Sequence, residues 1–206
     1  GEPGKTPDPG PLTFGRPAWF GRWAEEHKAC REGVILMDMS FMSKFEVSGP
    51  DAGEALNYLC TSDVQSGLGR ITYTQWLSAA GKLEGDVTVS RLGEERYMVV
   101  ATDTQHRHAE AWLRRNLRPY RAAVTDVTGA WAQLNVQGPL SRELLQDVTS
   151  ADMTDEAFPF RTAREIDVGY ARAICNRITY VGELGYELLV PTEQAVHVYD
   201  LLVEAG

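Results

Sequence analysis

The sequence predicts an α+β fold in which antiparallel strands form hairpins and helices are inserted between groups of strands. A run rich in β-branched and aromatic residues at 71–77 turns at Ala80-Gly81 and returns at 86–91, which is typical of a β-hairpin. A second hairpin region covers about 164–190, and helical patterns separate the two regions. Because helices and strands do not alternate one by one, a parallel βαβ sheet is not predicted.

The helices and strands before the first hairpin are predicted from the spacing of apolar residues and from residue types that begin or end helices. Residues 21–32 have helical polarity and stop at Gly33, a residue type that commonly ends helices. A short buried strand or turn is expected at 34–40, and the alternation at 44–49 predicts a strand. Pro50 suits the start of a helix, whose apolar face would carry Ala55, Leu56 and Leu59.

The elements after the hairpin are assigned by the same signals. The turn at Gly93-Glu94-Glu95 precedes a strand, and Pro139 opens a helix. The predicted order is a strand at 97–101, a helix at 104–117, strands at 121–126 and 131–136, a helix at 140–145, the hairpin region, and a closing amphipathic helix from Glu193.

Length and composition limit the classes of function. The chain has 206 residues, 43% of them apolar, which is enough for a core. Its net charge of -9 argues against nucleic acid as a partner, because phosphate binding needs a basic surface. No apolar run approaches the roughly 20 residues of a membrane span, so no membrane partner is expected. Residues 1–16 are rich in Pro and Gly and are interpreted as a leader or linker to a domain over 17–206.

The three cysteines are scattered, without a CxxC pair, and predict neither a disulfide framework nor a zinc site. A reducing compartment fits them best: the cytoplasm of a bacterium, or the mitochondrial matrix in a eukaryote. His106 and His108 form an HxH pattern with Glu110 nearby. Because residues two apart on a helix do not share a face, no metal site is predicted there.

Asp86 is the first candidate for chemistry. If Val87 and Val89 face the core, Asp86 lies on a polar stripe with Thr88 and Ser90. A carboxylate beside a binding site can accept a proton or stabilise a developing cation. The alternative is an aspartate that only ends a turn, which is the commoner use of this residue at strand ends.

The stretch from Tyr180 to Glu187 is the second candidate. Gly182 and Gly185 bracket Glu183, and glycines allow the close turn that would aim the carboxylate in a fixed direction. A carboxylate can accept two parallel hydrogen bonds from a guanidine-like edge such as that of a pterin ring. The alternative is a surface hairpin with acidic tips, which the spacing alone favours.

Several blocks taken together resemble the glycine-cleavage T-protein (aminomethyltransferase) superfamily, in the branch fused to sarcosine and dimethylglycine dehydrogenases. These blocks occur in the family's order over about residues 17–205, which is more specific than any one of them. The blocks are 33–42, 45–52, 73–89 with Gly81 and Asp86, 135–139, the Ala157-Phe158-Pro159-Phe160 run, and 179–187.

The resemblance implies an α+β folate-binding fold that transfers a one-carbon unit to tetrahydrofolate. In the flavin-linked branch the donor is a small N-methylated amine oxidised by an FAD domain, and the product is 5,10-methylenetetrahydrofolate. Carried over by motif, Asp86 falls beside the reactive nitrogens of the folate and Glu183 on the pterin. Tyr180, Tyr73 and Trp76 are implied to flank the ring, and Thr102 stands where the T-protein has an asparagine.

The departures from the family are informative as well. No GxGxxG fingerprint occurs, so FAD is expected only in a fused domain or a partner chain. The family's C-terminal barrel is expected to lie beyond Gly206. Two alternatives stay open: a folate-dependent demethylase of another methyl donor, and a regulatory relative such as the regulatory subunit of pyruvate dehydrogenase phosphatase.

Overall fold

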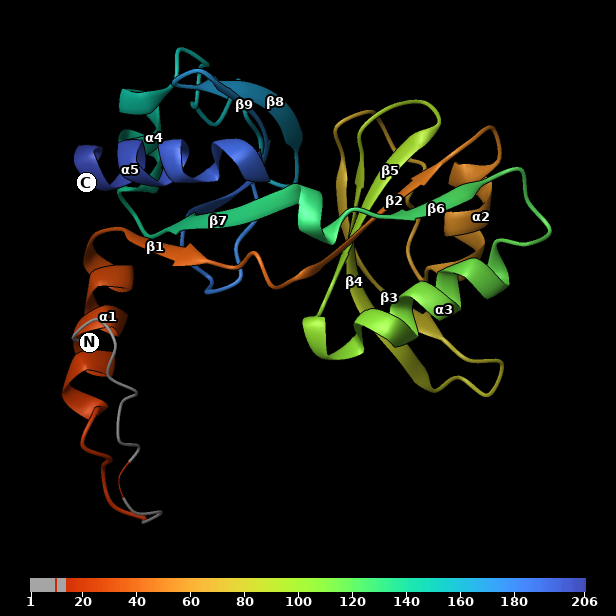
Figure 1. The fold of residues 1–206 in the computed structure, drawn as a ribbon, viewed down its shortest axis with the longest axis horizontal. Coiled ribbons are helices and arrows are strands. Elements are labelled where there is room, and N and C mark those ends of the chain that lie inside the picture. The colour runs from red at the N-terminus through yellow and green to blue at the C-terminus, as the bar shows by residue number, and fades with distance from the viewer. Residues whose placement is uncertain (1–9, 11–13) are drawn as a thin grey trace.

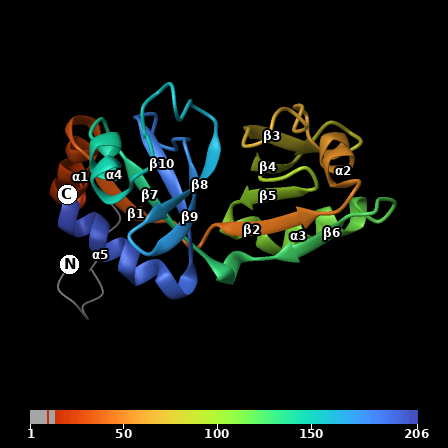
Figure 2. The same cartoon turned by 90° about the horizontal axis from the view of Figure 1, so that it is seen from above.

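The computed structural model describes residues 10 and 14–206 and contains two antiparallel sheets that lie side by side (Figures 1 and 2). Most of the predicted leader over residues 1–16 lies outside the described residues. Among the described residues, no helix combines the length and the apolar character that crossing a membrane requires. The predicted α+β class, with antiparallel strands and inserted helices, is confirmed.

The predicted order of elements is also confirmed. The helices are α1 (Phe20–Glu32), α2 (Ala52–Leu59), α3 (His106–Asn116), α4 (Ser141–Val148) and α5 (Ala195–Ala205). The strands are β1 (Ile35–Asp38), β2 (Ser43–Ser48), β3 (Ile71–Leu77), β4 (Leu83–Arg91), β5 (Arg96–Ala101), β6 (Ala123–Asp126), β7 (Trp131–Gln137), β8 (Ala163–Val168), β9 (Ala171–Asn176) and β10 (Gly185–Pro191).

Each sheet has five strands in the described part of the chain. Sheet I has the order β1-β7-β10-β9-β8 and sheet II the order β3-β4-β5-β2-β6. The chain passes between the sheets from β1 to β2 and returns from β6 to β7 (Figure 2). Helices α4 and α5 lie with sheet I, and α2 and α3 with sheet II (Figure 1). Each helix pair therefore covers the outer face of one sheet, because apolar residues of both elements share one cluster.

Trp76 lies in the core of sheet II, so the expectation that it flanks a bound ring is wrong for this structure. Its side chain is 0% exposed and belongs to the same apolar cluster as Phe45, Val87 and Val99. Gly85 stands opposite Trp76 in the register, and a Cβ at position 85 would lie 2.7 Å from Cε3 of the indole. The glycine thus leaves room for the indole to pack inward, on the face opposite to Asp86.

The inner faces of the two sheets meet through a smaller apolar cluster. Sheet II contributes Ile71, Met98 and Val100, and sheet I contributes Ala163, Ile174 and Leu189. The backbone joins the sheets along the same edge, where Ile71 N donates to Arg161 O (2.9 Å) and Ala163 N donates to Gly69 O (2.7 Å). This contact fixes the sheets relative to each other, because apolar burial and backbone bonds act at one place.

Beyond the apolar contact, the inner face of sheet I is polar. The register aligns Asn135, Glu187 and Asn176 in one transverse row across β7, β10 and β9, named here the acceptor row. Gln137 and Gln133 flank the row on the same face of β7. Both asparagines are 1% exposed, whereas Glu187 is partly exposed.

The buried Lys44 of sheet II and the partly exposed Glu187 of sheet I interact electrostatically at this place. Burial raises the pKa of Glu187 to about 7, against the lowering effects of its hydrogen bond from Asn135 and of the nearby Lys44. Burial likewise lowers the pKa of Lys44 to about 8, although Asp38, Glu187 and Asp126 act in the opposite direction. The Lys44 ammonium donates to the carbonyls of Ser40 (3.1 Å) and Met42 (2.8 Å). Folding therefore holds Glu187 in an environment that disfavours its ionised form.

We predict that Gly85→Ala destabilises the chain by about 1–3 kcal/mol, because the added methyl group overpacks the buried indole of Trp76. Chemical denaturation followed by tryptophan fluorescence measures this loss. Gly67→Ala is the matched control, since a Cβ there meets no atom within 4 Å. Equal stability of both variants would contradict the close packing of residues 76 and 85.

We also predict a stability difference that depends on pH for Glu187→Gln. The folded pKa of Glu187, about 7, lies above the ordinary 4.5, so its contribution to stability is present at low pH and is lost as the pH rises through 7. Between pH 5 and 7.5 the wild type should lose about 2 kcal/mol relative to the variant. Lys44 stays largely protonated in this window and Cys175 stays neutral.

Urea unfolding of both proteins at several pH values provides the measurement. Glu165→Gln on the exposed edge strand β8 is the control and should follow the wild type. If wild type and Glu187→Gln change in parallel between pH 5 and 7.5, the carboxyl of Glu187 does not titrate in a buried environment.

Candidate functional site

Asp86 lies on the inner face of sheet II, as the alternation in the sequence predicts. Val87 and Val89 are buried in the core, and the Asp86 side chain is exposed on the other face. Its carboxylate accepts a hydrogen bond from the hydroxyl of Tyr73 (2.7 Å to Oδ2) and one from Nε2 of Gln75 (3.1 Å to Oδ1). Both donors come from β3, so the antiparallel pairing of β3 and β4 holds the carboxylate in a fixed direction.

The bond to Asp86 keeps Tyr73 neutral. The hydrogen bond to Asp86 raises the pKa of Tyr73, with smaller effects from burial and from the negative charge of Asp86. Tyr73 thus stays a hydrogen-bond donor at neutral pH while about half of its surface (51%) is exposed. Thr102 follows β5 directly, and continuing the register of β4 and β5 by one residue places it beside Asp86 on the side opposite to Gln75.

Tyr180 lies on the turn between β9 and β10. Its side chain is 79% exposed, and its phenol has a minor raising effect on the pKa of Tyr73, after the effects of Asp86 and of burial. The turn is fixed on sheet I, because Thr179 Oγ1 donates to Gln137 Oε1 (2.8 Å) and accepts from Gly182 N (3.1 Å). Gly182 has a φ of 83°, a conformation that glycine adopts without strain.

Glu183, in contrast, is turned toward the N-terminal helix. Its carboxylate forms an ion pair with a guanidinium nitrogen of Arg31 in the last turn of α1, and its side chain is 20% exposed. In the part of the chain that the structure describes, no hydrogen bond or ion pair joins Glu183 to Asp86 or Tyr73. The contact with Arg31 demonstrates that this carboxylate can accept from a guanidine-like group in its present orientation.

The structure brings together three of the six predicted residues. Asp86, Tyr73 and Thr102 lie together on the inner face of sheet II, whereas Tyr180 and Glu183 lie on the segment between β9 and β10 and Trp76 is buried. Sequence reasoning did not single out Gln75 and Arg31, which contact the predicted residues Asp86 and Glu183, or the partly buried Glu187. The alternation along β3 places Gln75 on the face of Tyr73, so this signal was available. Arg31 and Glu187 depend on contacts between distant segments, for which the sequence offers no local pattern.

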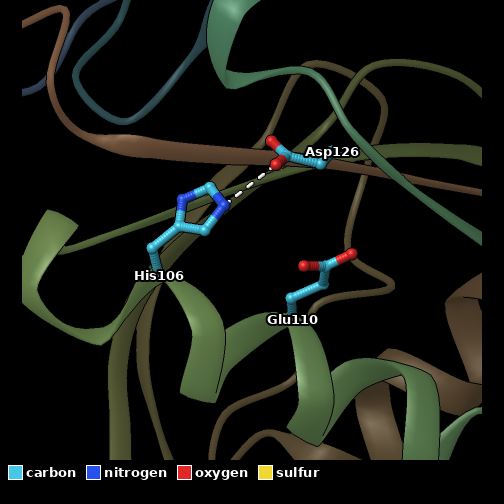
Figure 3. Close-up of side chains that lie close together, drawn as sticks. All are labelled: His106, Glu110 and Asp126. Carbon is cyan, nitrogen blue, oxygen red and sulfur yellow. Dashed lines mark hydrogen bonds and ion pairs between the residues drawn. The ribbon is translucent and has the colours of Figure 1, made fainter.

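A cluster of His106, Glu110 and Asp126 could hold a metal ion by the spacing of its ligand atoms, which lie within 4.8 Å of one another (Figure 3). Each side chain has a partner in the protein. His106 lies 2.9 Å from both Ser43 Oγ and Asp126 Oδ2, and Glu110 accepts from Arg114 Nε (2.8 Å). The cluster therefore serves to join the start of α3 to β6 and β2. His108, as expected, points elsewhere and pairs with Glu84.

Every strand pair in both sheets is antiparallel, so the described residues contain no parallel βαβ unit of the Rossmann type.

The family model described as "GCVT N-terminal domain" matches residues 9–206. The chain is 43% identical over its whole length to 4-methylaminobutanoate oxidase (formaldehyde-forming) from Paenarthrobacter nicotinovorans, covering 25% of that protein. It is 35% identical to the pyruvate dehydrogenase phosphatase regulatory subunit and 33% identical to sarcosine dehydrogenase, both mitochondrial proteins of Mus musculus, over 94% of the chain and 23% of each relative. The chain thus spans about a quarter of the length of these relatives.

Among solved structures, the aminomethyltransferase T of the glycine cleavage system from Bartonella henselae is similar with a TM-score of 0.77 and 26% identity. The match covers 87% of this chain and 48% of that protein. Sequence and fold therefore agree over nearly all of the described residues. The chain belongs to the GCVT N-terminal domain family and is homologous to aminomethyltransferases and to sarcosine and dimethylglycine dehydrogenases.

Proposed function

We propose that this aminomethyltransferase-type domain binds tetrahydrofolate and accepts a one-carbon unit from an oxidised N-methylated amine, which yields 5,10-methylenetetrahydrofolate. The observation that carries the proposal is the exposed Asp86 carboxylate, held in a fixed direction by Tyr73 and Gln75. Two exposed phenols and a fixed carboxylate suit a flat ring that carries nitrogen groups.

Asp86 would act by electrostatics and position. Its negative charge would stabilise the iminium cation while the nitrogens N5 and N10 of tetrahydrofolate attack the same carbon. Both nitrogens gain a bond to that carbon, and the carbon–nitrogen bond of the iminium breaks. The demethylated amine leaves with the two displaced N–H protons as an ammonium ion. Tyr73, kept neutral by its bond to Asp86, would hold the carboxylate in place during this exchange.

Glu183 would bind the pterin edge. The ion pair with Arg31 supports this role, because a guanidinium and the 2-amino and N3–H groups of a pterin present similar parallel donors. Tyr180 would flank the ring from the turn between β9 and β10, and Thr102 would add a polar contact beside Asp86. The domain that performs this function would comprise residues 17–206.

The choice of donor rests on the relatives. The names of two relatives refer to oxidation of N-methylated compounds, 4-methylaminobutanoate and sarcosine, and a third relative is dimethylglycine dehydrogenase of Rattus norvegicus. An oxidised N-methyl amine is therefore the donor class we favour over methyl ethers and sulfonium compounds. The FAD that would oxidise the amine belongs to a fused domain or partner chain, in a bacterial cytoplasm or a mitochondrial matrix.

A regulatory role is the second candidate. The observation in its favour is the 35% identity to the pyruvate dehydrogenase phosphatase regulatory subunit, which covers 94% of the chain. Identity of that size supports a shared fold, and fold alone does not decide function. The network of Asp86, Tyr73 and Gln75 favours the enzyme, because a solvent-exposed carboxylate held by two donors has no evident structural task.

The first test is titration calorimetry of 5-formyltetrahydrofolate into the 206-residue chain. We expect saturable binding by the wild type and a loss of about 30-fold or more in Glu183→Ala, which corresponds to about 2 kcal/mol for a broken charged hydrogen-bonded pair. Glu165→Ala is the control, since Glu165 is exposed and pairs with Arg172 on the neighbouring strand. If the 206-residue chain does not bind, the same titration on a chain extended beyond Gly206 decides the outcome: binding there shows that the following segment is part of the site, and absence of binding in both rejects the folate proposal and favours the regulatory candidate.

The second test separates binding from transfer. Asp86→Asn keeps the shape of the side chain and removes its charge, so folate affinity should change less than about threefold while methylene transfer falls about 100-fold. Transfer is measured as 5,10-methylenetetrahydrofolate formed in the complete protein that oxidises the amine. Asn116→Ala, on the far end of α3, should leave transfer unchanged. A wild-type transfer rate in Asp86→Asn would remove Asp86 from the mechanism.

A further inference from the structure

Arg161 is the only residue other than glycine with a positive φ in the described part of the chain, at 62°. A residue with a Cβ meets steric strain in this left-handed region, so a bulky side chain there is uncommon. Such conformations persist where the surrounding structure imposes them, and they concentrate at functional sites. Glycine would fit this backbone better, so the presence of an arginine indicates a use for its guanidinium.

Hydrogen bonds to both sheets fix the backbone of Arg161. Its carbonyl accepts from Ile71 N on the edge strand β3 of sheet II (2.9 Å), and its own N–H donates to Arg177 O, just beyond the end of β9 in sheet I (2.9 Å). The joint between the sheets therefore imposes the positive φ. It also holds the Cα of Arg161 at a defined place, from which an exposed side chain extends.

The strand register determines which face Arg161 borders. An isolated antiparallel bridge pairs Arg70 with Thr162, which places Arg161 opposite Ile71. Ile71 shares the inner face of β3 with Tyr73, because side chains two residues apart on a strand lie on the same face. Arg161 thus borders, beside the edge of β3, the inner face on which the candidate site lies.

The distance from Asp86 limits what Arg161 could bind. Gln75 pairs with Asp86 in the register, and Ile71 lies four residues before Gln75 on β3. At about 3.3 Å per residue, Arg161 is displaced along the strand by about 13 Å from Asp86. A small amine with its nitrogen at Asp86 cannot span this distance. In folate a p-aminobenzoyl group separates the reactive nitrogens from the glutamate, so the glutamate carboxylates reach about this far.

The guanidinium of Arg161 has no carboxylate partner among the described residues. Its central carbon lies 5.7 Å from the ring centroid of Phe160, which is 49% exposed. In contrast, Arg172 and Arg177 of the neighbouring strand region form ion pairs with acidic side chains. A guanidinium binds a carboxylate through two parallel N–H groups. Arg161 therefore offers these donors to a carboxylate supplied by a ligand.

Resting on the proposed function, we propose that Arg161 binds a carboxylate of the glutamate in folate and so anchors the end of the ligand that lies farthest from the ring. Asp86 would lie at the reactive nitrogens, and the p-aminobenzoyl group would run along β3, past Tyr73, to the corner formed by Phe160 and Arg161. Arg161 is a binding residue for the tail and takes no part in the chemistry at the transferred carbon.

Calorimetry with two ligands tests this contact. The first ligand is 5-formyltetrahydrofolate, and the second is its dimethyl ester, which has the same skeleton without the two negative charges. We expect the wild-type chain to bind the free acid about tenfold more tightly than the ester, as the loss of one charged hydrogen-bonded pair predicts. In Arg161→Gly this preference should disappear, and the ester should bind as tightly as it does to the wild type.

The choice of glycine keeps the test independent of folding. Glycine adopts a φ of 62° without strain, so Arg161→Gly should melt at or above the temperature of the wild type. Arg70→Ala is the matched control, because Arg70 is an exposed arginine in the adjacent bridge and its side chain lies on the face opposite to that of Ile71. This control should keep the wild-type preference for the free acid.

The outcomes separate this inference from the proposed function. The inference is wrong if the wild type binds acid and ester equally, or if Arg161→Gly keeps the preference. The folate function still stands in that case when Glu183→Ala loses binding. If the 206-residue chain binds neither ligand, the comparison is made on the chain extended beyond Gly206, and absence of binding there as well rejects both proposals.

Discussion

The apolar contact between the two sheets is the constraint on which the candidate site depends. Ile71, Met98 and Val100 pack against Ala163, Ile174 and Leu189, and backbone bonds join the edges of the sheets at the same place. Because this contact lies at one end of the inner faces, the other end is left for polar groups. Asp86 lies on the inner face of sheet II and Glu187 on the inner face of sheet I.

Polar side chains between two sheets lower the stability of the fold unless they are hydrogen-bonded or bind a ligand. The interface between sheets I and II therefore has an apolar part and a separate polar part. Lys44 and Glu187 interact electrostatically, and burial lowers the pKa of Lys44 to about 8 and raises the pKa of Glu187 to about 7. A chain selected only for stability would fill these positions with apolar side chains. The retention of charges and amides at this end is typical of a binding site, where stability is given up for chemistry.

The candidate site residues differ in how far the sequence predicts their positions. The strand alternation at 86–89 correctly predicts that Asp86 faces away from the core, since that period is local. Motif resemblance correctly selects the family, but it cannot tell whether an aromatic residue packs inward, and Trp76 does so against Gly85. Arg31 and Glu183 are far apart in the chain, so their ion pair follows only from the way α1 lies against sheet I.

The sequence by itself determined the α+β class, the order of helices and strands, the hairpin that carries Asp86 and the resemblance to the family. These properties follow from periodicity, turn residues and ordered motifs, which are local or additive along the chain. Only the tertiary structure decided which faces of the two sheets meet, that Trp76 is buried, and that Arg31 pairs with Glu183. The reason is that packing of sheet against sheet depends on contacts between distant segments, which no local pattern records.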